Sequence, residues 1–272
     1  NNDAIREVNL YKSFFPLKYG GRSSSVIDVR MREGNSKERE RSAGLGLIAS
    51  KVLLEGPLKK KEGSYLVSGR FGYPGVVAGL LGSNLTSKPQ MWFYDVNAKV
   101  NRTLDARNRM FFSLYSGGDH TVFNKLVKGY GMDWGNATAT IRWNHILNDK
   151  TNVNTSAVFS NYYYKYKSLS DGLRYVWKSN MQSYQLKSDW ERYQNNLLTL
   201  KGGVNLHYFT TMPGEVGKSG KDSNITPSQM PRKSLWDAAL YAEANYKFLP
   251  HFLLNAGVRL SVLHAPASAY YA

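Results

Sequence analysis

The fold class follows from eight residues, Tyr94-Asp95-Val96-Asn97-Ala98-Lys99-Val100-Asn101. Apolar and polar side chains alternate strictly along them. In an extended strand, successive side chains point to opposite faces, so this alternation gathers the apolar groups on one face and the polar groups on the other. The segment therefore predicts a β-strand that separates an apolar environment from a polar one.

The same alternation returns along most of the chain, in runs of about ten residues, the length a tilted strand needs to cross a bilayer. The apolar faces of these runs carry Ala137, Ala139, Ile141 and Trp143, then Leu198, Leu200, Val204, Leu206 and Tyr208, then Ala238, Leu240, Ala242, Ala244 and Tyr246, and last Leu254, Ala256, Val258, Leu260 and Val262. The opposite faces carry Lys99, Arg142, Lys187, Lys201, Glu243 and Arg259. Each of these charges would need a buried partner in a sandwich core. A solvated lumen accommodates them, so the pattern favours a transmembrane antiparallel β-barrel.

The predicted connections alternate in length. Short turns are expected at residues 60–63, 104–108, 147–150, 193–196 and 249–251, and long polar loops at 74–90, 117–131, 168–179 and 213–234. Short turns at one end and long loops at the other are typical of outer-membrane barrels. About eleven strands result, the first two at residues 40–47 and 49–58.

Composition excludes several classes of protein. The chain has no cysteine, so it has no disulfide framework, thiolate metal site or cysteine nucleophile. The net charge of +16 suits an anionic partner. The only tight basic run is Lys59-Lys60-Lys61, in a predicted turn, and no recognition helix accompanies it. We expect no nucleic-acid partner.

No catalytic or cofactor site is predicted. The five histidines, His120, His145, His207, His251 and His264, are dispersed and lack metal-ligand spacing. None has an obvious serine or carboxylate neighbour in the sequence. We expect no enzyme activity, no metal and no cofactor.

The N-terminal residues carry a different pattern. They read Tyr11-Lys12-x-x-Phe15-Pro16-x-x-Tyr19-Gly20-Gly21-Arg22-x-Ser24-Ser25-Val26. This wording resembles the end of the plug domain in TonB-dependent outer-membrane receptors of the Bacteroidetes type. Later segments are similar to that family too, namely Leu54-Glu55-Gly56-Pro57-Leu58 and Trp134-Gly135-Asn136-Ala137-Thr138.

The resemblance implies a fragment of a plugged barrel. Residues 1–38 would be the C-terminal part of the plug domain, and residues 39–272 the N-terminal half of a barrel of about twenty-two strands. Such a protein lies in the bacterial cell outer membrane, among outer-membrane lipid. It imports a scarce ligand, an oligosaccharide, a peptide or a metal chelate, powered through TonB. TonB would bind a segment that this sequence does not contain, and a surface lipoprotein lid or larger complex is a further expected partner.

Two sets of site residues follow from this interpretation. Tyr162, Tyr164 and Trp177, with the long loops, are candidate substrate contacts, because aromatic faces stack on sugar rings and apolar ligands. The same aromatic residues would also suit membrane-interface anchors. Lys12, Arg22 and Arg30 in the plug segment are expected to pair with Glu55, Glu191 and Glu243 on the lumenal face, forming a lock of weak, partly solvated ion pairs.

Two other functions remain open at this stage. The barrel could serve as a scaffold or docking subunit for a surface lipoprotein or a larger complex. A more remote alternative is a soluble β-repeat binding module, since the first four turns recur at a spacing of roughly 42–45 residues, within the range of a propeller blade. No repeated motif of that fold accompanies the spacing.

Overall fold

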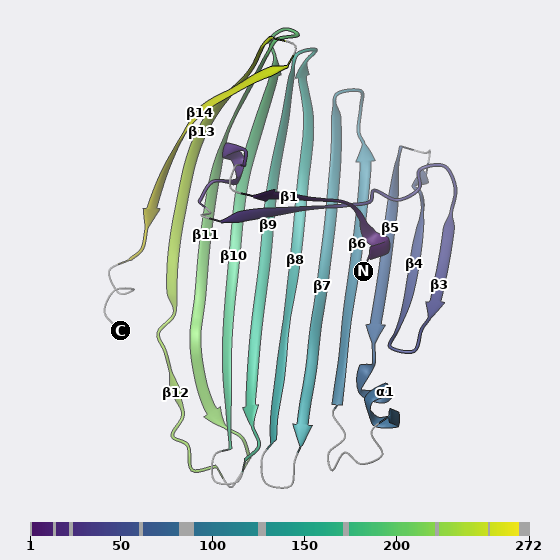
Figure 1. Ribbon diagram of the computed structural model, residues 1–272, viewed down its shortest axis with the longest axis vertical. Helices are drawn as coiled ribbons and strands as arrows, with labels where there is room; N and C mark the ends of the chain where they lie inside the picture. Colours follow the sequence, from purple (N-terminus) through teal and green to yellow (C-terminus); the bar gives the residue numbers. More distant parts are fainter. Residues whose placement is uncertain are drawn as a thin grey trace.

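A computed structural model describes residues 2–12, 15–21, 24–59, 62–81, 90–124, 129–170, 174–220, 223–249 and 251–266. These residues form two antiparallel sheets (Figure 1). The small sheet pairs β1 (Ile5–Lys12) with β2 (Ser25–Met31). The large sheet holds β3 (Glu40–Leu45), β4 (Ala49–Pro57), β5 (Gly63–Gly72), β6 (Gln90–Thr103), β7 (Asn108–Asn124), β8 (Gly129–Asn148), β9 (Thr151–Ser168), β10 (Tyr175–Tyr193), β11 (Leu198–Lys218), β12 (Ser228–Gln229), β13 (Lys233–Leu249) and β14 (Phe252–His264). Two 3-10 turns, η1 (Asn2–Ala4) and η2 (Leu17–Tyr19), and helix α1 (Pro74–Leu81) complete the described elements.

The large sheet is a meander. From β3 to β14, each strand pairs with the next one along the chain, and only β12 lies off this path, beside β11. Antiparallel neighbours need only short connections, so sequence order and spatial order coincide. The path contains eleven described strands, as the sequence predicted, and its first two strands begin at the expected residues, Glu40 and Ala49.

Strands β1 and β2 cross one face of the large sheet (Figure 1). We call this face the inner face and the described residues up to Gly34 the N-terminal segment. Helical turn η1 contacts β5, and η2 contacts β13 and β14, so the segment reaches from one side of the large sheet to the other.

Burial in the large sheet is inverted relative to a soluble protein. On β6, the polar residues Asp95 and Lys99 are 4% and 6% exposed, whereas the apolar residues Val96 and Val100 are 45% and 38% exposed. The polar residues lie on the inner face, where Lys99 Nζ donates a hydrogen bond to the Met31 carbonyl at 3.1 Å. An apolar outer face and a polar inner face are the arrangement expected of strands that meet lipid on one side and a polar lumen on the other.

The apolar outer face extends over the other long strands. Its exposed members include Leu114, Ile141, Leu186, Leu206, Leu240, Leu260 and Val262. An aromatic ladder also crosses this face, with ring centroids 5.1 Å apart between Phe159 and Tyr184, 6.2 Å between Tyr184 and Tyr208, and 4.5 Å between Tyr208 and Trp236. Aromatic rings in such rows suit the boundary between lipid and water. No helix in the described part of the chain is long and apolar enough to cross a membrane.

The predicted long loops are wrong in extent. Strands β7 and β8 run through most of residues 117–131, and β9, β10 and β11 extend through much of 168–179 and 213–234. Strand β11 is 21 residues long, about twice the length that crosses a bilayer. Beyond the apolar band, glycine, polar and aromatic residues occur on both faces of a strand, so the alternation disappears while the backbone ladder continues. Within 74–90, residues Pro74–Leu81 form α1, and 82–89 lie outside the described residues.

The short turns at residues 104–108, 147–150 and 193–196 lie together at the opposite end (Figure 1). The predicted turns at 60–63 and 249–251 include residues that lie outside the described ones. In the turn at 104–108 Asp105 Oδ1 accepts a hydrogen bond from the Arg107 amide at 2.8 Å, and in the turn at 193–196 Asn195 Oδ1 accepts from the Leu197 and Leu198 amides at 2.9 Å each. Asp and Asn side chains that bond the backbone two residues on stabilise such turns. The bond from the Arg107 amide, with further bonds from Asn108, lowers the pKa of Asp105.

Candidate functional site: an aromatic patch and a charged cavity on the inner face

The three aromatic residues predicted to contact substrate share one face of the sheet. On β9, Val158 faces the N-terminal segment, and steps of two residues from it lead to Tyr162 and Tyr164. Tyr164 lies opposite Trp134, and Trp177 lies opposite Tyr166, the next residue of the same face. The structure therefore brings Tyr162, Tyr164 and Trp177 together on the inner face, toward the ends of the strands that lie far from the short turns.

These residues belong to a larger group, which we call the aromatic patch. Its members are Phe123, Tyr130, Trp134, Tyr162, Tyr164, Tyr166, Tyr175 and Trp177. Ring centroids lie 5.1 Å apart between Phe123 and Tyr130, 6.4 Å between Tyr130 and Tyr166, and 6.0 Å between Tyr166 and Tyr175. Offset and tilted rings at such distances form an extended apolar surface that still offers hydroxyl groups.

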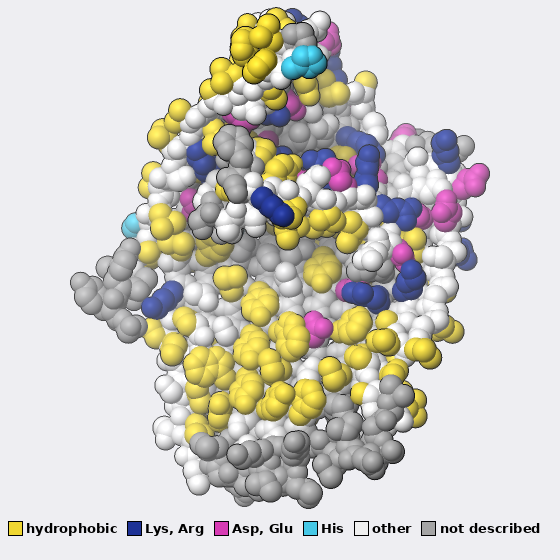
Figure 2. Space-filling view, viewed as in Figure 1, with side chains coloured by type: hydrophobic (Ala, Val, Ile, Leu, Met, Phe, Trp, Pro, Cys, Tyr) yellow, Lys and Arg dark blue, Asp and Glu magenta, His cyan; other side chains and the backbone are white. Residues whose placement is uncertain are grey.

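The aromatic patch is open to solvent. Tyr130 and Tyr162 are 39% and 40% exposed. Figure 2 shows hydrophobic side chains gathered on the part of the inner face that the N-terminal segment leaves uncovered, while charged side chains gather around that segment. Trp177 is held against the sheet by a glycine, because a Cβ atom at Gly214 would lie 2.6 Å from its ring.

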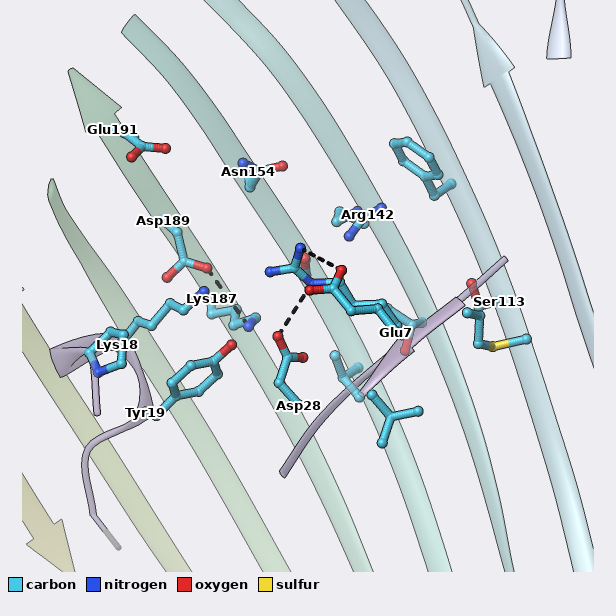
Figure 3. A pocket seen from close by; sticks show the side chains of 18 of the residues that line it. Glu7, Lys18, Tyr19, Asp28, Ser113, Arg142, Asn154, Lys187, Asp189 and Glu191 are labelled. Atoms are coloured by element: carbon cyan, nitrogen blue, oxygen red, sulfur yellow. Dashed lines mark hydrogen bonds and ion pairs between the residues drawn. The ribbon is translucent and has the colours of Figure 1, made fainter. Parts of the chain in front are cut away.

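A cavity of about 760 Å³ lies between the N-terminal segment and the inner face (Figure 3). The segment contributes Glu7, Lys18 and Asp28 among others, and the wall contributes Arg142, Lys187 and Glu191 among others. Burial lowers the pKa of Lys18 despite the opposing field of Asp189, and burial and a hydrogen bond with Asp28 raise the pKa of Tyr19. The cavity is thus bounded by charges from both parts of the chain.

One side of the N-terminal segment is fixed by ion pairs with the wall. Arg32 Nη2 lies 2.7 Å from Glu55 Oε1, and Glu55 is 1% exposed. Arg109 Nη2 lies 2.8 Å from Glu33 Oε2, and Lys51 Nζ lies 2.8 Å from Asp3 Oδ2. Arg32, Glu33 and Asp3 were missed in the sequence, although the run Arg32-Glu33-Gly34 at the end of a predicted strand marks a charged turn.

The other side is held through the backbone of Leu17. The Leu17 amide donates a hydrogen bond to Glu243 Oε2 at 3.1 Å, and the Leu17 carbonyl accepts one from Arg259 Nη1 at 2.9 Å. Arg259 also runs beside Gly20, where a Cβ atom would lie 2.2 Å from its side chain. This contact explains why a glycine stands at Gly20.

The expected lock residues differ in the contacts they make. Glu55 and Glu243 contact the N-terminal segment, although their partners are Arg32 and Leu17. Arg30 bonds within the small sheet, 3.6 Å from Glu7 and 3.3 Å from Asp28, and Glu191 lies 3.3 Å from Lys201 on the wall. Lys12 makes no ion pair with any described residue, and Arg22 lies outside the described residues.

Two histidines have neighbours that the sequence did not reveal. His120 pairs with Asp133 on the adjacent strand, and His207 Nε2 lies 3.0 Å from Ser183 Oγ. A hydrolytic site also needs free amides to stabilise an oxyanion. Around Ser183 the strands continue in register on both sides, which engages the backbone in the sheet ladder. No group of three His, Asp or Glu side chains in the described part of the chain could hold a metal ion.

Similarity searches find related folds among solved structures. The chain aligns with the ferric preacinetobactin receptor BauA of Acinetobacter baumannii at 10% identity and a TM-score of 0.65, covering 89% of this chain and 44% of that one. It aligns with the copper transporter OprC at 12% identity and a TM-score of 0.72, covering 96% and 43%, and with the ferric-catecholate import receptor Fiu of E. coli K12 at 13% and 0.71, covering 97% and 50%. No protein-family model and no curated protein matches the sequence.

The chain thus spans half or less of the length of these receptors. At such low identity the agreement concerns the fold. It covers both the large sheet and most of the N-terminal segment, since nearly the whole chain aligns. The chain therefore has the fold of part of an outer-membrane receptor barrel, as the sequence predicted.

Proposed function

We propose that this chain is part of a TonB-dependent transporter of the bacterial outer membrane, which imports a ligand and catalyses no reaction. Residues 1–38 would be the C-terminal part of a plug domain and 39–272 the N-terminal half of the barrel. The observation that carries the proposal is the inverted sheet whose polar inner face is crossed by the N-terminal segment. A barrel that conducts a solute needs a polar interior and a removable obstruction, and the polar inner face and the N-terminal segment across it support these two roles.

The aromatic patch is the ligand-contacting surface in this proposal. It lies on the inner face, outside the area covered by the N-terminal segment, where a solute entering from the far end of the strands would meet it first. Planar aromatic faces bind ring-bearing and apolar ligands by stacking. Oligosaccharides, peptides and metal chelates all fit this chemistry. The three structural neighbours named above carry ferric compounds or copper, so a metal chelate is the first class to test.

The proposed lock holds the N-terminal segment during the resting state. Glu55 and Glu243 contribute the contacts described above, and Lys12, Arg22, Arg30 and Glu191 remain candidate members. The individual links are weak because their partners are partly solvated. A segment held by several weak links can stay docked at rest and yield to a pull, which is what energised import requires.

Import is tested by uptake of radioactive iron as a catechol chelate in a strain whose copy of the complete gene is replaced by variants. We expect Trp177→Ala and Tyr164→Ala each to raise the chelate concentration that gives half-maximal uptake by about threefold to tenfold. One aromatic contact contributes about 0.5–1.5 kcal/mol beyond its buried area. Tyr184→Ala, on the outer aromatic ladder of the same strand as Trp177, is the matched control and should leave half-saturation unchanged.

Two results would contradict the proposal. Uptake through this protein that persists after deletion of TonB would rule out energised import. Equal effects of Trp177→Ala and Tyr184→Ala would show that the inner aromatic patch does not contact the ligand. If the catechol chelate is not taken up, the same variants are compared with oligosaccharide and peptide substrates. A surface lipoprotein partner, which the family resemblance suggests, is tested by co-purification from outer membranes.

A further inference from the structure

The wall of the cavity carries a surplus of positive charge around one phenylalanine. Phe111 lies on the inner face of β7, and its ring centroid is 5.7 Å from Lys99 Nζ, 4.9 Å from Arg109 Cζ and 4.2 Å from Arg142 Cζ. Glu33 pairs with Arg109, and Lys99 bonds a backbone carbonyl. Three cations thus share one carboxylate in a partly buried place, an arrangement that costs free energy unless an anion compensates it.

Arg142 is the member of this group to which the described residues offer neither an ion pair nor a hydrogen-bond acceptor. Among the described residues it makes no ion pair, and its Nε atom is buried without a hydrogen-bond partner. Its side chain lines the cavity (Figure 3). A guanidinium that stacks on an aromatic ring and leaves its remaining N–H groups free presents a planar fork, the geometry that binds carboxylate and phosphate with two parallel hydrogen bonds.

Hydroxyl groups surround this guanidinium. Ser156, 4% exposed, lies directly opposite Arg142 on β9, and Ser113 and Thr140 lie opposite one another one step further along β7 and β8. All three line the cavity. Hydroxyls donate hydrogen bonds to oxyanions at little cost in reorganisation.

The carboxylates that also line the cavity are already engaged. Glu7 and Asp28 face Arg30, Glu33 faces Arg109, Glu191 faces Lys201, and Asp189 lies 3.7 Å from Lys187. Glu243 accepts the Leu17 amide. Their charges are therefore partly neutralised where they stand, whereas Arg142 and Arg6, which also lines the cavity, face no carboxylate within 4.0 Å among the described residues.

We propose that Arg142, Ser156, Ser113 and Thr140 form an oxyanion-binding site in the cavity beneath the N-terminal segment. Its ligand is a small solute bearing a phosphate or carboxylate group, within the size range of a cavity of about 760 Å³. The site lies apart from the aromatic patch and goes beyond the proposed import function. A bound anion would also neutralise charge between the wall and the N-terminal segment, and so favour the docked segment.

The test is isothermal titration calorimetry on the purified intact protein in detergent, with sodium phosphate and with sodium citrate as titrants, at ionic strength held constant with sodium chloride. We expect binding of at least one of the two anions. Arg142→Gln should weaken that binding at least about tenfold, the loss expected when a charge-assisted hydrogen bond is removed. Arg102→Gln is the matched control, because Arg102 lies on β6 outside the cavity and pairs with Glu62 on an exposed surface.

Several results would overturn the proposed site. Binding of neither anion by the wild-type protein, or equal binding by Arg142→Gln and the wild type, overturns the proposal. Loss of binding in Arg102→Gln as well would show a non-specific charge effect and overturn it too. If Arg142→Gln does not fold, Arg142→Lys replaces it. That variant keeps the charge and loses the planar fork, so unchanged affinity would contradict the site. None of these results bears on uptake, so the transport proposal stands or falls separately.

Discussion

At the scale of single residues, polar side chains that the alternation assigns to a solvated lumen are in fact buried. Lys99 and Asn101 are nearly inaccessible because the N-terminal segment lies over them. The sequence predicted their face correctly. Their burial was not predictable, because it depends on contacts with residues about seventy positions away. For the same reason the partner of Glu55 was missed: the sequence offered Lys12, Arg22 and Arg30 as a set of possible cations, and Arg32, which pairs with Glu55, was not among them.

The first prediction concerns Glu55. Its ion pair with Arg32 joins the N-terminal segment to β4, and the side chain of Arg32 is 39% exposed, which weakens the pair. We expect Glu55→Ala to destabilise the docked segment by about 1–3 kcal/mol, the cost of leaving a partly buried charge without its partner. Hydrogen exchange should rise in β1 and β2 and stay low in β8 and β9. Glu62→Ala, which removes an exposed pair, is the control, and equal exchange in both variants would contradict the lock.

At the scale of elements, the alternation of apolar and polar residues located most strands of the large sheet. It did not predict the strand ends, where the alternation is lost. Strands β7 to β11 continue past the apolar band. Among the residues there are Gly117, Gly118 and Gly135, which have no side chain and so contribute nothing to the alternation. Their extension is set by pairing with equally long neighbours, which a single strand's sequence does not report. The turns at residues 104–108 and 193–196 were predicted well, because Asp105 and Asn195 bond their own backbone and need no distant partner.

The second prediction concerns the link between the small sheet and the large one. Gly34 has a φ of +85°, and a Cβ atom there would lie 2.3 Å from the Tyr65 carbonyl oxygen. We expect Gly34→Ala to displace the clamp that Ser64 and Asn101 form on the Glu33 carbonyl, and to lower the melting temperature in detergent. Gly79→Ala in α1 is the matched control, since nothing lies within 4 Å of its Cβ and alanine favours a helix. An unchanged melting temperature in Gly34→Ala would show that the link adapts.

At the scale of the whole molecule, the arrangement of faces identifies the surroundings of the sheet. Apolar side chains on the outer face and charged ones inside are stable together only if the outside is not water. The ligand, by contrast, could not be predicted from this arrangement. Aromatic side chains can stack on many compounds with rings, and the positions of those on the inner face do not discriminate among such compounds.

The third prediction uses two adjacent residues of β10 that point to opposite faces. Leu186 is 51% exposed on the outer face, and Gln185 lies on the inner face, where its amide bonds Asn205. We expect Leu186→Arg to cost about 1–3 kcal/mol in the free energy of folding into lipid vesicles, between the cost of an arginine at the interface and its cost at the bilayer midplane, because Leu186 lies one step inside the aromatic ladder. Gln185→Arg should cost much less. Equal folding costs for the two variants would mean that the two faces of the strand are not in contact with different environments, lipid on one side and water on the other.

The way in which the wall binds the N-terminal segment has a mechanical consequence. Several of its attachments end on main-chain oxygens, those of Met31 and Glu33 at one end of the cavity and that of Leu17 at the other. A force applied at one end of the segment would load these attachments one after another. Each attachment would break before the next one bears the force. The peak force would then be that of the few hydrogen bonds and ion pairs at one attachment, while the total work would equal the sum over all attachments. Every residue has a main-chain carbonyl oxygen. Substitutions that change the side chains of Leu17, Met31 or Glu33 would therefore keep the hydrogen bonds from the wall to their carbonyl oxygens.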